Sequence, residues 1–318
     1  MTAFLAVRAA ALACACLGAL AAPARAEDGP EIVWPDPAGG LAIRRPFGAS
    51  EIVLRLSSRN AGAVDSLTWA GTEFVNSFDH GRELQSASAF DAYGECLNPT
   101  EAGSAADGTG GRSTSLLTGL RHGRAWVEAE TRMAYWLAPG QTSAGCARGA
   151  GPYSGALSEH TLRKRAAVGL PGIPNAIEIQ ASFDLPHAYD SATFEVLTAY
   201  MPPGFSQFWT FDPRNRTLAP LSHDSGEQGL PVILATPDGS RAMGVWSPGL
   251  PQPGRPNLGY GRFDFAALPG AGNATVKWNC VFREAAPAAG PHDYACYAVI
   301  GSLADVQAGM AALANGPP

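Results

Sequence analysis

"HTLRKRAAVGLPGIPNAIEIQASFDL", residues 160 to 185, decides the fold class of this 318-residue chain. Both halves of the stretch alternate apolar and polar residues, which is the period of a β-strand with one buried face. The two halves meet at PGIP, where Pro171 and Gly172 suit a tight turn. The stretch therefore predicts an antiparallel β-hairpin.

Strand patterns of the same kind recur at short spacing on both sides of this hairpin. They are separated by glycine and proline turns and do not alternate with helical segments, which disfavours a parallel α/β sheet. The segments concerned are 50–58, 60–76, 123–137, 192–201, 230–247, 260–268, 274–284 and 293–301. No repeat of fixed period is present, which argues against a propeller. The sequence predicts an all-β fold, a large antiparallel β-sandwich.

Only the last stretch, SLADVQAGMAALAN at 302–315, has helical spacing. Ser302 stands where a helix cap is expected. Apolar residues of one helical face follow at Leu303, Val306, Met310 and Leu313. We expect a single sandwich domain over 27–318 that ends in a short helix at about 302–314.

The first 26 residues predict export. Arg8 precedes an apolar run, and Ala24-Arg25-Ala26 is typical of the cleavage site of a secretory signal peptide. The run is too short for a membrane span, which needs about 20 residues. A lipoprotein anchor at Cys14 or Cys16 is the alternative. We expect a secreted or periplasmic protein that is cleaved after Ala26 and has no membrane span.

Four cysteines remain after such cleavage, namely Cys96, Cys146, Cys280 and Cys296. An even number in an exported chain predicts two disulfides, for which three pairings exist. Cys280 and Cys296 flank one expected hairpin, which favours Cys280–Cys296 together with Cys96–Cys146. The second pair would connect the two long loops, 95–115 and 138–158, and long loops of compact domains are often functional.

The charge pattern and the missing motifs limit the function. The formal net charge is −6, and no basic stripe is present, so we expect no nucleic-acid partner. No H-x-H or H-E-x-x-H pattern occurs, so we expect neither a metal site nor a cofactor. Calcium bound by loop carboxylates such as Asp107 is the alternative. His160 and His223 are the histidines best placed in the sequence for acid–base work. A P-loop, a G-x-G-x-x-G and a G-x-S-x-G motif are all missing, which disfavours nucleotide enzymes and serine hydrolases.

Polar side chains gather in NSFDHGRELQSASAFDAYGECLNPTEAGS, residues 76–104. Carboxylates in pairs suit acid–base work on a glycosidic bond. The catalytic candidates are Glu101, Glu95, Asp79 and His80. Amide and guanidinium groups suit sugar hydroxyls or a substrate carboxylate. The binding candidates are Arg82, Glu83, Gln85 and Asn98. A purely structural turn, in which Asp79 and Gly81 shape the backbone, is the alternative.

The aromatic residues concentrate in YMPPGFSQFWTFDP, residues 200–213. Flat aromatic faces match the apolar faces of sugar rings, so Trp209 is a candidate for stacking on a saccharide. The rings could instead close one end of the sandwich.

Two stretches carry a resemblance to a known family. GAVDSLTWAGTEFVNSFDHGRELQ, residues 62–85, resembles the opening of galactose-mutarotase-like proteins, and LRKRAAVGLPGIPNAIEIQASFDL, residues 162–185, resembles their central hairpin. The resemblance is one of layout over most of the chain. It implies a carbohydrate cleft on the concave face of the sandwich.

The chain departs from that family at the residues that matter for catalysis. Mutarotases use a late glutamate as base and a histidine in the middle of the chain as acid, whereas Glu284 is the only glutamate after Glu227 here and has different surroundings.

The predicted function is an exported protein that acts on or binds a glycan, as a glycoside hydrolase or polysaccharide lyase. The alternatives are a non-catalytic glycan-binding or envelope-associated module and an aldose epimerase. The sequence does not determine the glycan or the oligomeric state.

Overall fold

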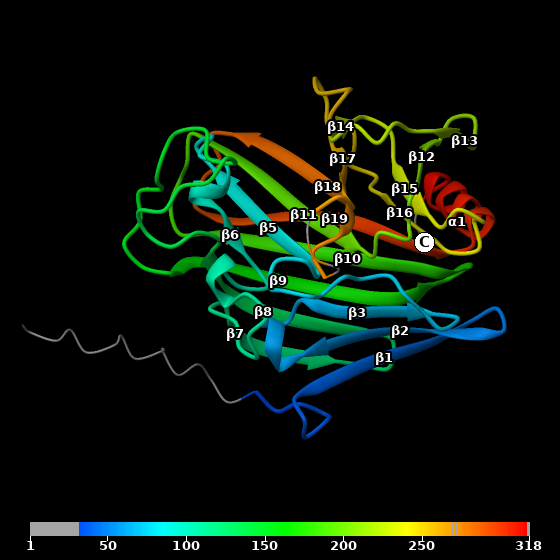
Figure 1. Cartoon of the computed structure of the whole chain (residues 1–318), viewed down its shortest axis with the longest axis horizontal. Coiled ribbons are helices and arrows are strands. Elements are labelled where there is room, and N and C mark those ends of the chain that lie inside the picture. Colours follow the sequence, from blue (N-terminus) through cyan, green and yellow to red (C-terminus); the bar gives the residue numbers. More distant parts are fainter. Residues whose placement is uncertain (1–31, 269, 271, 317–318) are drawn as a thin grey trace, which may run out of the picture.

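The computed structural model describes residues 32–268, 270 and 272–316. The expected signal peptide and its cleavage site lie outside the described residues. The described part of the chain forms one network of antiparallel strands with a single α-helix near its end, which confirms the predicted all-β sandwich (Figure 1).

Strand pairing and side-chain packing divide this network into two layers. In the first layer the strands follow the order β7 (Leu116–His122), β8 (Trp126–Tyr135), β9 (Leu157–Leu170), β10 (Ile173–Leu185), β19 (Gly290–Gly301), β16 (Ala242–Trp246), β15 (Val232–Ala235), β12 (Gln207–Asp212) and β13 (Thr217–Pro220).

In the second layer the order is β1 (Gly40–Phe47), β2 (Ser50–Ser57), β3 (Val64–Trp69), β5 (Leu84–Phe90), β11 (Ser191–Met201), β18 (Thr275–Ala285), β17 (Tyr260–Phe265) and β14 (Gly226–Gln228). The short strand β4 (Thr72–Glu73) pairs with the end of β3 in a hairpin, and β6 (Pro99–Thr100) pairs with both β5 and β8. Three short 3-10 helices lie in the loops: η1 (Ser58–Asn60), η2 (Glu95–Leu97) and η3 (Ala105–Asp107).

The predicted hairpin is β9 and β10. Leu170 pairs with Ile173 at its turn, and Gly172 there has a φ of 75°, which glycine adopts without strain. Buried and less buried residues alternate along most of both strands. The period-two pattern of the sequence is therefore the pattern of burial.

The core lies between the two layers. Phe183 of β10 packs on Phe194 of β11 with ring centroids 5.0 Å apart, and Phe90 of β5 stacks over His160 of β9 at 4.8 Å. Burying each such ring contributes about 1.5–3 kcal/mol. The Cys280–Cys296 disulfide adds a covalent link between β18 and β19, one strand from each layer.

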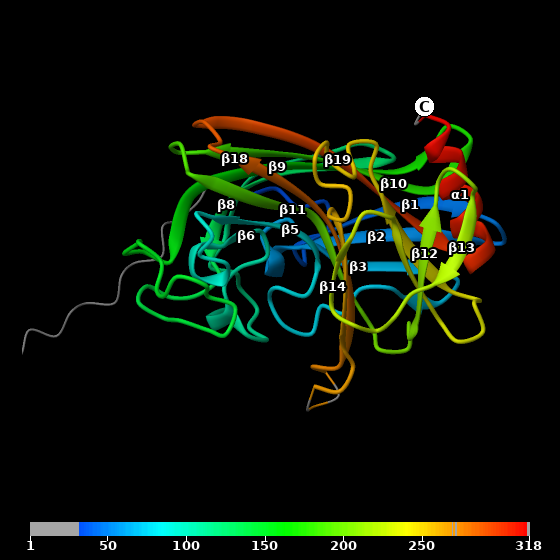
Figure 2. The ribbon, with the colours of Figure 1, turned by 90° about the horizontal axis from the view of Figure 1, so that it is seen from above.

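The predicted C-terminal helix is α1 (Leu303–Ala314). Ser302 accepts a hydrogen bond from the backbone N–H of Asp305, and the carboxylate of Asp305 accepts from the backbone N–H of Ser302. This capping box satisfies two N–H groups that a helix start leaves without partners. The apolar face of the helix packs against β10, β16 and β19. Figure 2 shows α1 at one end of the molecule, near β10 and β12.

Candidate functional site

The outer face of the second layer carries a hollow of about 670 Å³, hereafter the outer pocket. Because side chains alternate along β5, β11 and β18, every second residue of these strands faces away from the core. Small side chains make up much of the floor: Ala87, Ala89, Ser191 and Thr193. The floor therefore leaves space above the sheet that larger side chains would have filled.

Glu195 and Lys277 are the charged pair of the floor. Lys277 Nζ on β18 lies 3.1 Å from Glu195 Oε2 on β11, and it also lies 4.9 Å from the ring centre of Tyr200. The Glu195 side chain keeps 28% of its surface exposed, against 11% for Lys277. The β11–β18 register shifts directly after Glu195, which places a bulge at this point of the pocket.

The electrostatics of the pair favour two charged groups. Burial acts to raise the pKa of Glu195, but the charge of Lys277 and hydrogen bonds from Lys277, Asn279 and Thr198 outweigh it and hold this pKa below its usual value. Burial likewise acts to lower the pKa of Lys277, but Glu195 and Tyr200 outweigh it, so this pKa is raised. Glu195 therefore presents a stable carboxylate acceptor to the pocket.

A second ion pair forms the wall on the β18 side. Arg283 donates to both carboxylate oxygens of Glu227, and the N–H of Gly259 lies 3.3 Å from Glu227 Oε2. Gln252 fastens the neighbouring loop to β18 through two hydrogen bonds with the backbone of Arg283, at 2.7 and 3.1 Å. Arg255 lies on this loop and lines the pocket.

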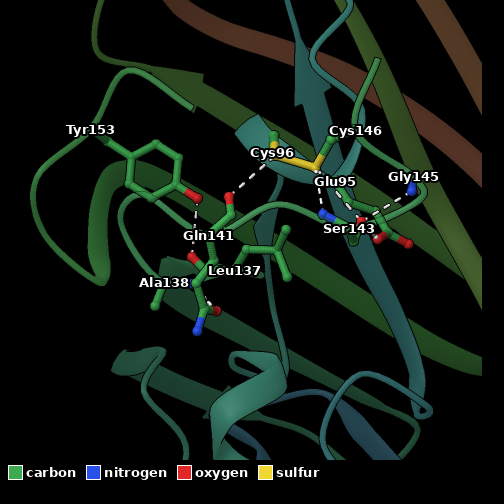
Figure 3. The surroundings of a disulfide bond; sticks show 9 residues. All are labelled: Glu95, Cys96, Leu137, Ala138, Gln141, Ser143, Gly145, Cys146 and Tyr153. Carbon is green, nitrogen blue, oxygen red and sulfur yellow. Dashed lines mark hydrogen bonds between the residues drawn. A yellow bond between two sulfur atoms is a disulfide. The ribbon is translucent and has the colours of Figure 1, made fainter. Parts of the chain in front are cut away.

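The opposite wall is held by a disulfide. Cys96–Cys146 fastens the loop that follows β8 to the 3-10 helix η2 (Figure 3). Glu95 lines the pocket beside this bond and accepts a hydrogen bond from the Ser143 hydroxyl. Both disulfides match the pairing that the sequence favours.

Trp136 supplies an aromatic surface on the same side. Its ring lies directly over Gly81, where an added Cβ would come within 2.5 Å of the ring, and Gly81 has a φ of 95°. A glycine is needed at this point for both reasons. Gln85 keeps the turn in place, because its Nε2 donates to the carbonyl oxygen of Gly81 at 2.7 Å and its Oε1 accepts from the N–H of Ala102.

Three of the site residues expected from the sequence line the outer pocket, namely Glu95, Gln85 and Asn98. The Asn98 side chain donates to the carbonyl oxygen of Ser88, so it also holds the edge of β5. The remaining expected residues take positions behind or away from the pocket.

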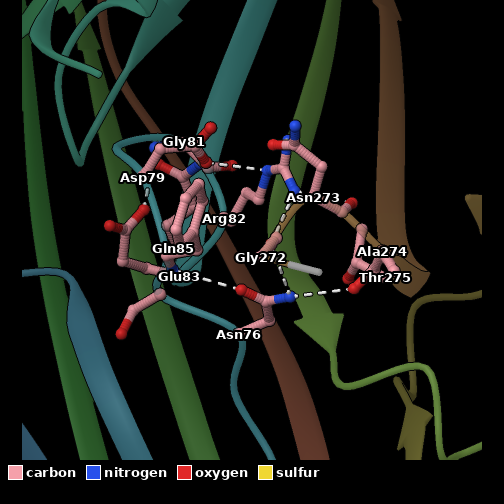
Figure 4. Close-up of polar contacts among 12 residues, drawn as sticks. Asn76, Asp79, Gly81, Arg82, Glu83, Gln85, Gly272, Asn273, Ala274 and Thr275 are labelled. Atoms are coloured by element: carbon pink, nitrogen blue, oxygen red, sulfur yellow. Dashed lines mark hydrogen bonds and ion pairs between the residues drawn. The ribbon is translucent and has the colours of Figure 1, made fainter. Parts of the chain in front are cut away.

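Asp79 and Arg82 pair with each other. Arg82 Nε lies 2.7 Å from Asp79 Oδ1, and its Nη atoms donate to the backbone and side chain of Asn273 (Figure 4). The pair thus connects the turn after β4 with the loop before β18, and the structure places it among the groups that hold this turn.

Glu83 and His80 are buried beneath the same turn. Glu83 Oε2 accepts from the N–H of Gly81 at 2.9 Å, and the two ring nitrogens of His80 lie 2.7 and 3.0 Å from the carbonyl oxygens of Ala102 and Gly110. Through Gly81 these residues support the position of Trp136.

Glu101 lies inside the sandwich. It is fully buried, pairs with Lys164 of β9, and accepts a hydrogen bond from the N–H of Ser86 at 2.8 Å. Lys164 belongs to the inward-facing residues of β9, so the pair lies between the layers, whereas the outer pocket lies on the other side of β5.

Trp209 lies on β12, in the cluster packed around α1, and does not line the outer pocket.

His160 is buried against Tyr189, and burial lowers the pKa of His160 to about 3. His223 is exposed and pairs with Asp264 at 2.7 Å. Asp107 accepts from the backbone of Ser104 and Thr114. Among the described residues no group of three potential metal ligands is present.

Burial makes Glu83 a source of pH-dependent stability, because it raises the pKa of this carboxyl to about 8. The unfolded chain loses the proton near pH 4.5, whereas the folded protein keeps it up to about pH 8. Between these values the folded state binds more protons, so the free energy of unfolding contributed by Glu83 falls as pH rises. One such proton makes the fall as steep as about 1.4 kcal/mol per pH unit. We predict that Glu83→Gln flattens the stability profile over this window by removing that contribution.

Urea denaturation at a series of pH values between 4.5 and 8.5, the range set by the two pKa values, measures this contribution. Glu51→Gln is the control, because Glu51 lies in an exposed pair with Arg44. Parallel profiles for wild type and Glu83→Gln would contradict the prediction.

Sequence reasoning missed Glu195, Lys277, Arg283 and Trp136 as residues of the site, whereas Tyr200 belongs to the aromatic stretch 200–213 that it singled out. Glu195, Lys277 and Arg283 lie in strands whose alternation was used only to predict the fold. One signal was available: Lys277 is one of two lysines that follow the N-terminal 26 residues, and it stands in the apolar strand ATVKWNCVF. A lysine in such a strand has to find an acidic partner or a solvent-filled hollow.

No family model matches the chain, and no curated protein matches it. Similar solved structures include 4-α-glucanotransferase from Thermococcus litoralis (7% identity, TM-score 0.47, 82% of this chain and 37% of that chain). They also include heparan sulfate lyase HepC from Pedobacter heparinus (8% identity, TM-score 0.42, 83% of this chain and 35% of that chain). A third is a galactose mutarotase-like protein from Lactobacillus casei (10% identity, TM-score 0.45, 82% of this chain and 100% of that chain). This chain spans little more than a third of the first two proteins.

None of the described helices combines the length and the apolar character needed to cross a membrane.

Proposed function

We propose that this chain is an exported protein that binds a saccharide in the outer pocket. The observation that carries the proposal is the partly exposed Glu195 carboxylate, held by Lys277 above a floor of small residues. Sugar hydroxyls both donate and accept hydrogen bonds, so a fixed acceptor beside a fixed donor suits them. The two disulfides support export, since such bonds persist in oxidising compartments.

Trp136 completes the arrangement. Its ring is held over Gly81 on one side, and the residue lines the pocket. Pockets for small molecules combine apolar and aromatic surface with a few fixed polar groups. The aromatic surface would lie against the apolar face of a sugar ring, while Glu195 and Lys277 receive its hydroxyls.

We predict that Glu195→Gln and Trp136→Ala each weaken saccharide binding by about tenfold or more. Each loses an interaction of about 1.5 kcal/mol, a hydrogen bond to a charged group or a stacked ring. Titration calorimetry with a panel of neutral and acidic oligosaccharides measures the effect. Trp209→Phe, at the far end of the first layer, is the matched aromatic control. Unchanged affinity in both pocket variants would refute this site.

Catalysis on the bound saccharide is the second candidate function. Glu95 and Glu195 are two carboxylates that line one pocket, and such pairs perform acid–base chemistry in hydrolases, while Tyr200 lies beside Lys277 as a further proton donor. Proton NMR of the protein with the same panel separates the possibilities. New reducing ends indicate hydrolysis, unsaturated sugars a lyase and faster anomer exchange an epimerase, whereas binding without product indicates a binding module.

A further inference from the structure

The two ends of the outer pocket differ in charge. The β18 side of the pocket has three cations, of which Lys277 on the floor pairs with Glu195 and Arg283 on the wall pairs with Glu227. Arg255 is the third, and within the described part of the chain its guanidinium has no hydrogen-bond or ion-pair partner. This wall therefore carries one positive charge that no protein group balances.

Arg255 is also held in position. Its backbone N–H donates to the carbonyl oxygen of Gln252, which is itself fastened to β18 by two hydrogen bonds, and its own carbonyl oxygen accepts from the N–H of Leu258 at 3.2 Å. Farther along the loop, the carbonyl of Pro256 approaches Gly229 so closely that a Cβ there would lie 1.7 Å from the oxygen. These contacts fix the backbone from which the partly buried Arg255 side chain extends, so the loop itself need not be ordered when a ligand binds.

The opposite wall carries the reverse charge. Glu95 is exposed there, it accepts a hydrogen bond from the neutral Ser143 hydroxyl, and among the described residues it forms no ion pair. The two oxygens of Glu284 are held toward the other layer, by His292 and Tyr294 of β19. A ligand anion is thus attracted to the Arg255 end and repelled from the Glu95 end.

From this polarity we infer that the outer pocket takes an acidic saccharide whose carboxylate is bound by Arg255. The inference rests on the proposed saccharide-binding function and specifies the ligand class. The planar fork of an arginine matches a carboxylate with two parallel hydrogen bonds. The acid group sets the direction of the ligand across the floor, so that hydroxyl donors face Glu95.

Matched pairs of ligands test the inference directly. Short oligomers of galacturonate, glucuronate and mannuronate are compared by calorimetry with their methyl esters, which lack only the charge. We expect wild type to bind an acid at least about tenfold more tightly than its ester. Arg255→Gln should remove this preference, and Arg255→Lys should retain part of it. Arg214→Gln, an exposed arginine in the turn between β12 and β13, should leave it unchanged.

The outcomes separate the inference from the function on which it rests. Equal binding of acids and esters, or binding of neutral sugars alone, overturns the acidic ligand and leaves saccharide binding in place. The acidic ligand is likewise overturned, and saccharide binding stays in place, if Arg255→Gln weakens the binding of acids and of esters by the same factor. If no member of the panel binds, both proposals fail.

Discussion

Lys164→Met is expected to destabilise the protein by about 3–5 kcal/mol, because it leaves the Glu101 carboxyl without its partner inside the sandwich. The two side chains are 3% and 0% exposed, so water cannot replace the lost ammonium group. Methionine keeps the length of the lysine stem, which limits the cavity. Chemical denaturation followed by tryptophan fluorescence measures the change.

The double variant Lys164→Met with Glu101→Gln should recover much of this loss, since it removes both charges from the core. Arg44→Met is the matched control at the surface, where the pair with Glu51 is more than half exposed and worth about 0–1 kcal/mol. A small effect of Lys164→Met, similar to that of Arg44→Met, would contradict the structural assignment of the pair. A folded Glu101→Gln variant that binds ligand but loses turnover would instead support the catalytic assignment suggested by the sequence.

Removing the Cys96–Cys146 disulfide is expected to reduce both stability and ligand binding. The bond closes a loop with a sequence separation of 50 residues, and disulfides of this kind contribute about 2–4 kcal/mol. It also fastens the wall that carries Glu95, Gly145 and Ala147. Cys96→Ser with Cys146→Ser should therefore lower the midpoint of unfolding and weaken saccharide binding by several-fold at a temperature where the protein stays folded.

The second disulfide provides the control. Cys280–Cys296 joins the layers within the core, away from the residues that line the outer pocket. Cys280→Ala with Cys296→Ala should lower the stability but change the affinity of the folded protein little. Equal losses of affinity in both pairs of variants would show that the first disulfide acts on binding only through global stability.

Much of the architecture follows from local pattern. Alternation in the stretch 160–185 predicts the β9–β10 hairpin, and Ser302 with the apolar residues after it predicts α1. The hairpin and the helix depend on residues close in the sequence. The favoured cysteine pairing also agrees with the structure, but the hairpin from which Cys280–Cys296 was predicted does not form, because β18 pairs with β11 and β17 and β19 pairs with β10 and β16.

The placement of the polar residues is different. Glu101 and Glu95 are six positions apart and look equivalent in the sequence, yet one lies in the core and the other in the pocket. Burial of Glu101 depends on Lys164 of β9, and the state of Glu195 depends on Lys277 of β18, 82 positions away. The polar run at 79–83 supports the turn beneath Trp136 and lies mostly behind the pocket.

The sequence by itself determined the strand period, the antiparallel class, the terminal helix and the favoured pairing of the cysteines. Only the tertiary structure decided which face of each strand is covered and which is left open. The physical reason is that a period of two shows which residues share a face, whereas burial depends on the layer that packs against that face. In this protein β9 and β10 cover one face of β5 and β11, and the other face remains open as the outer pocket.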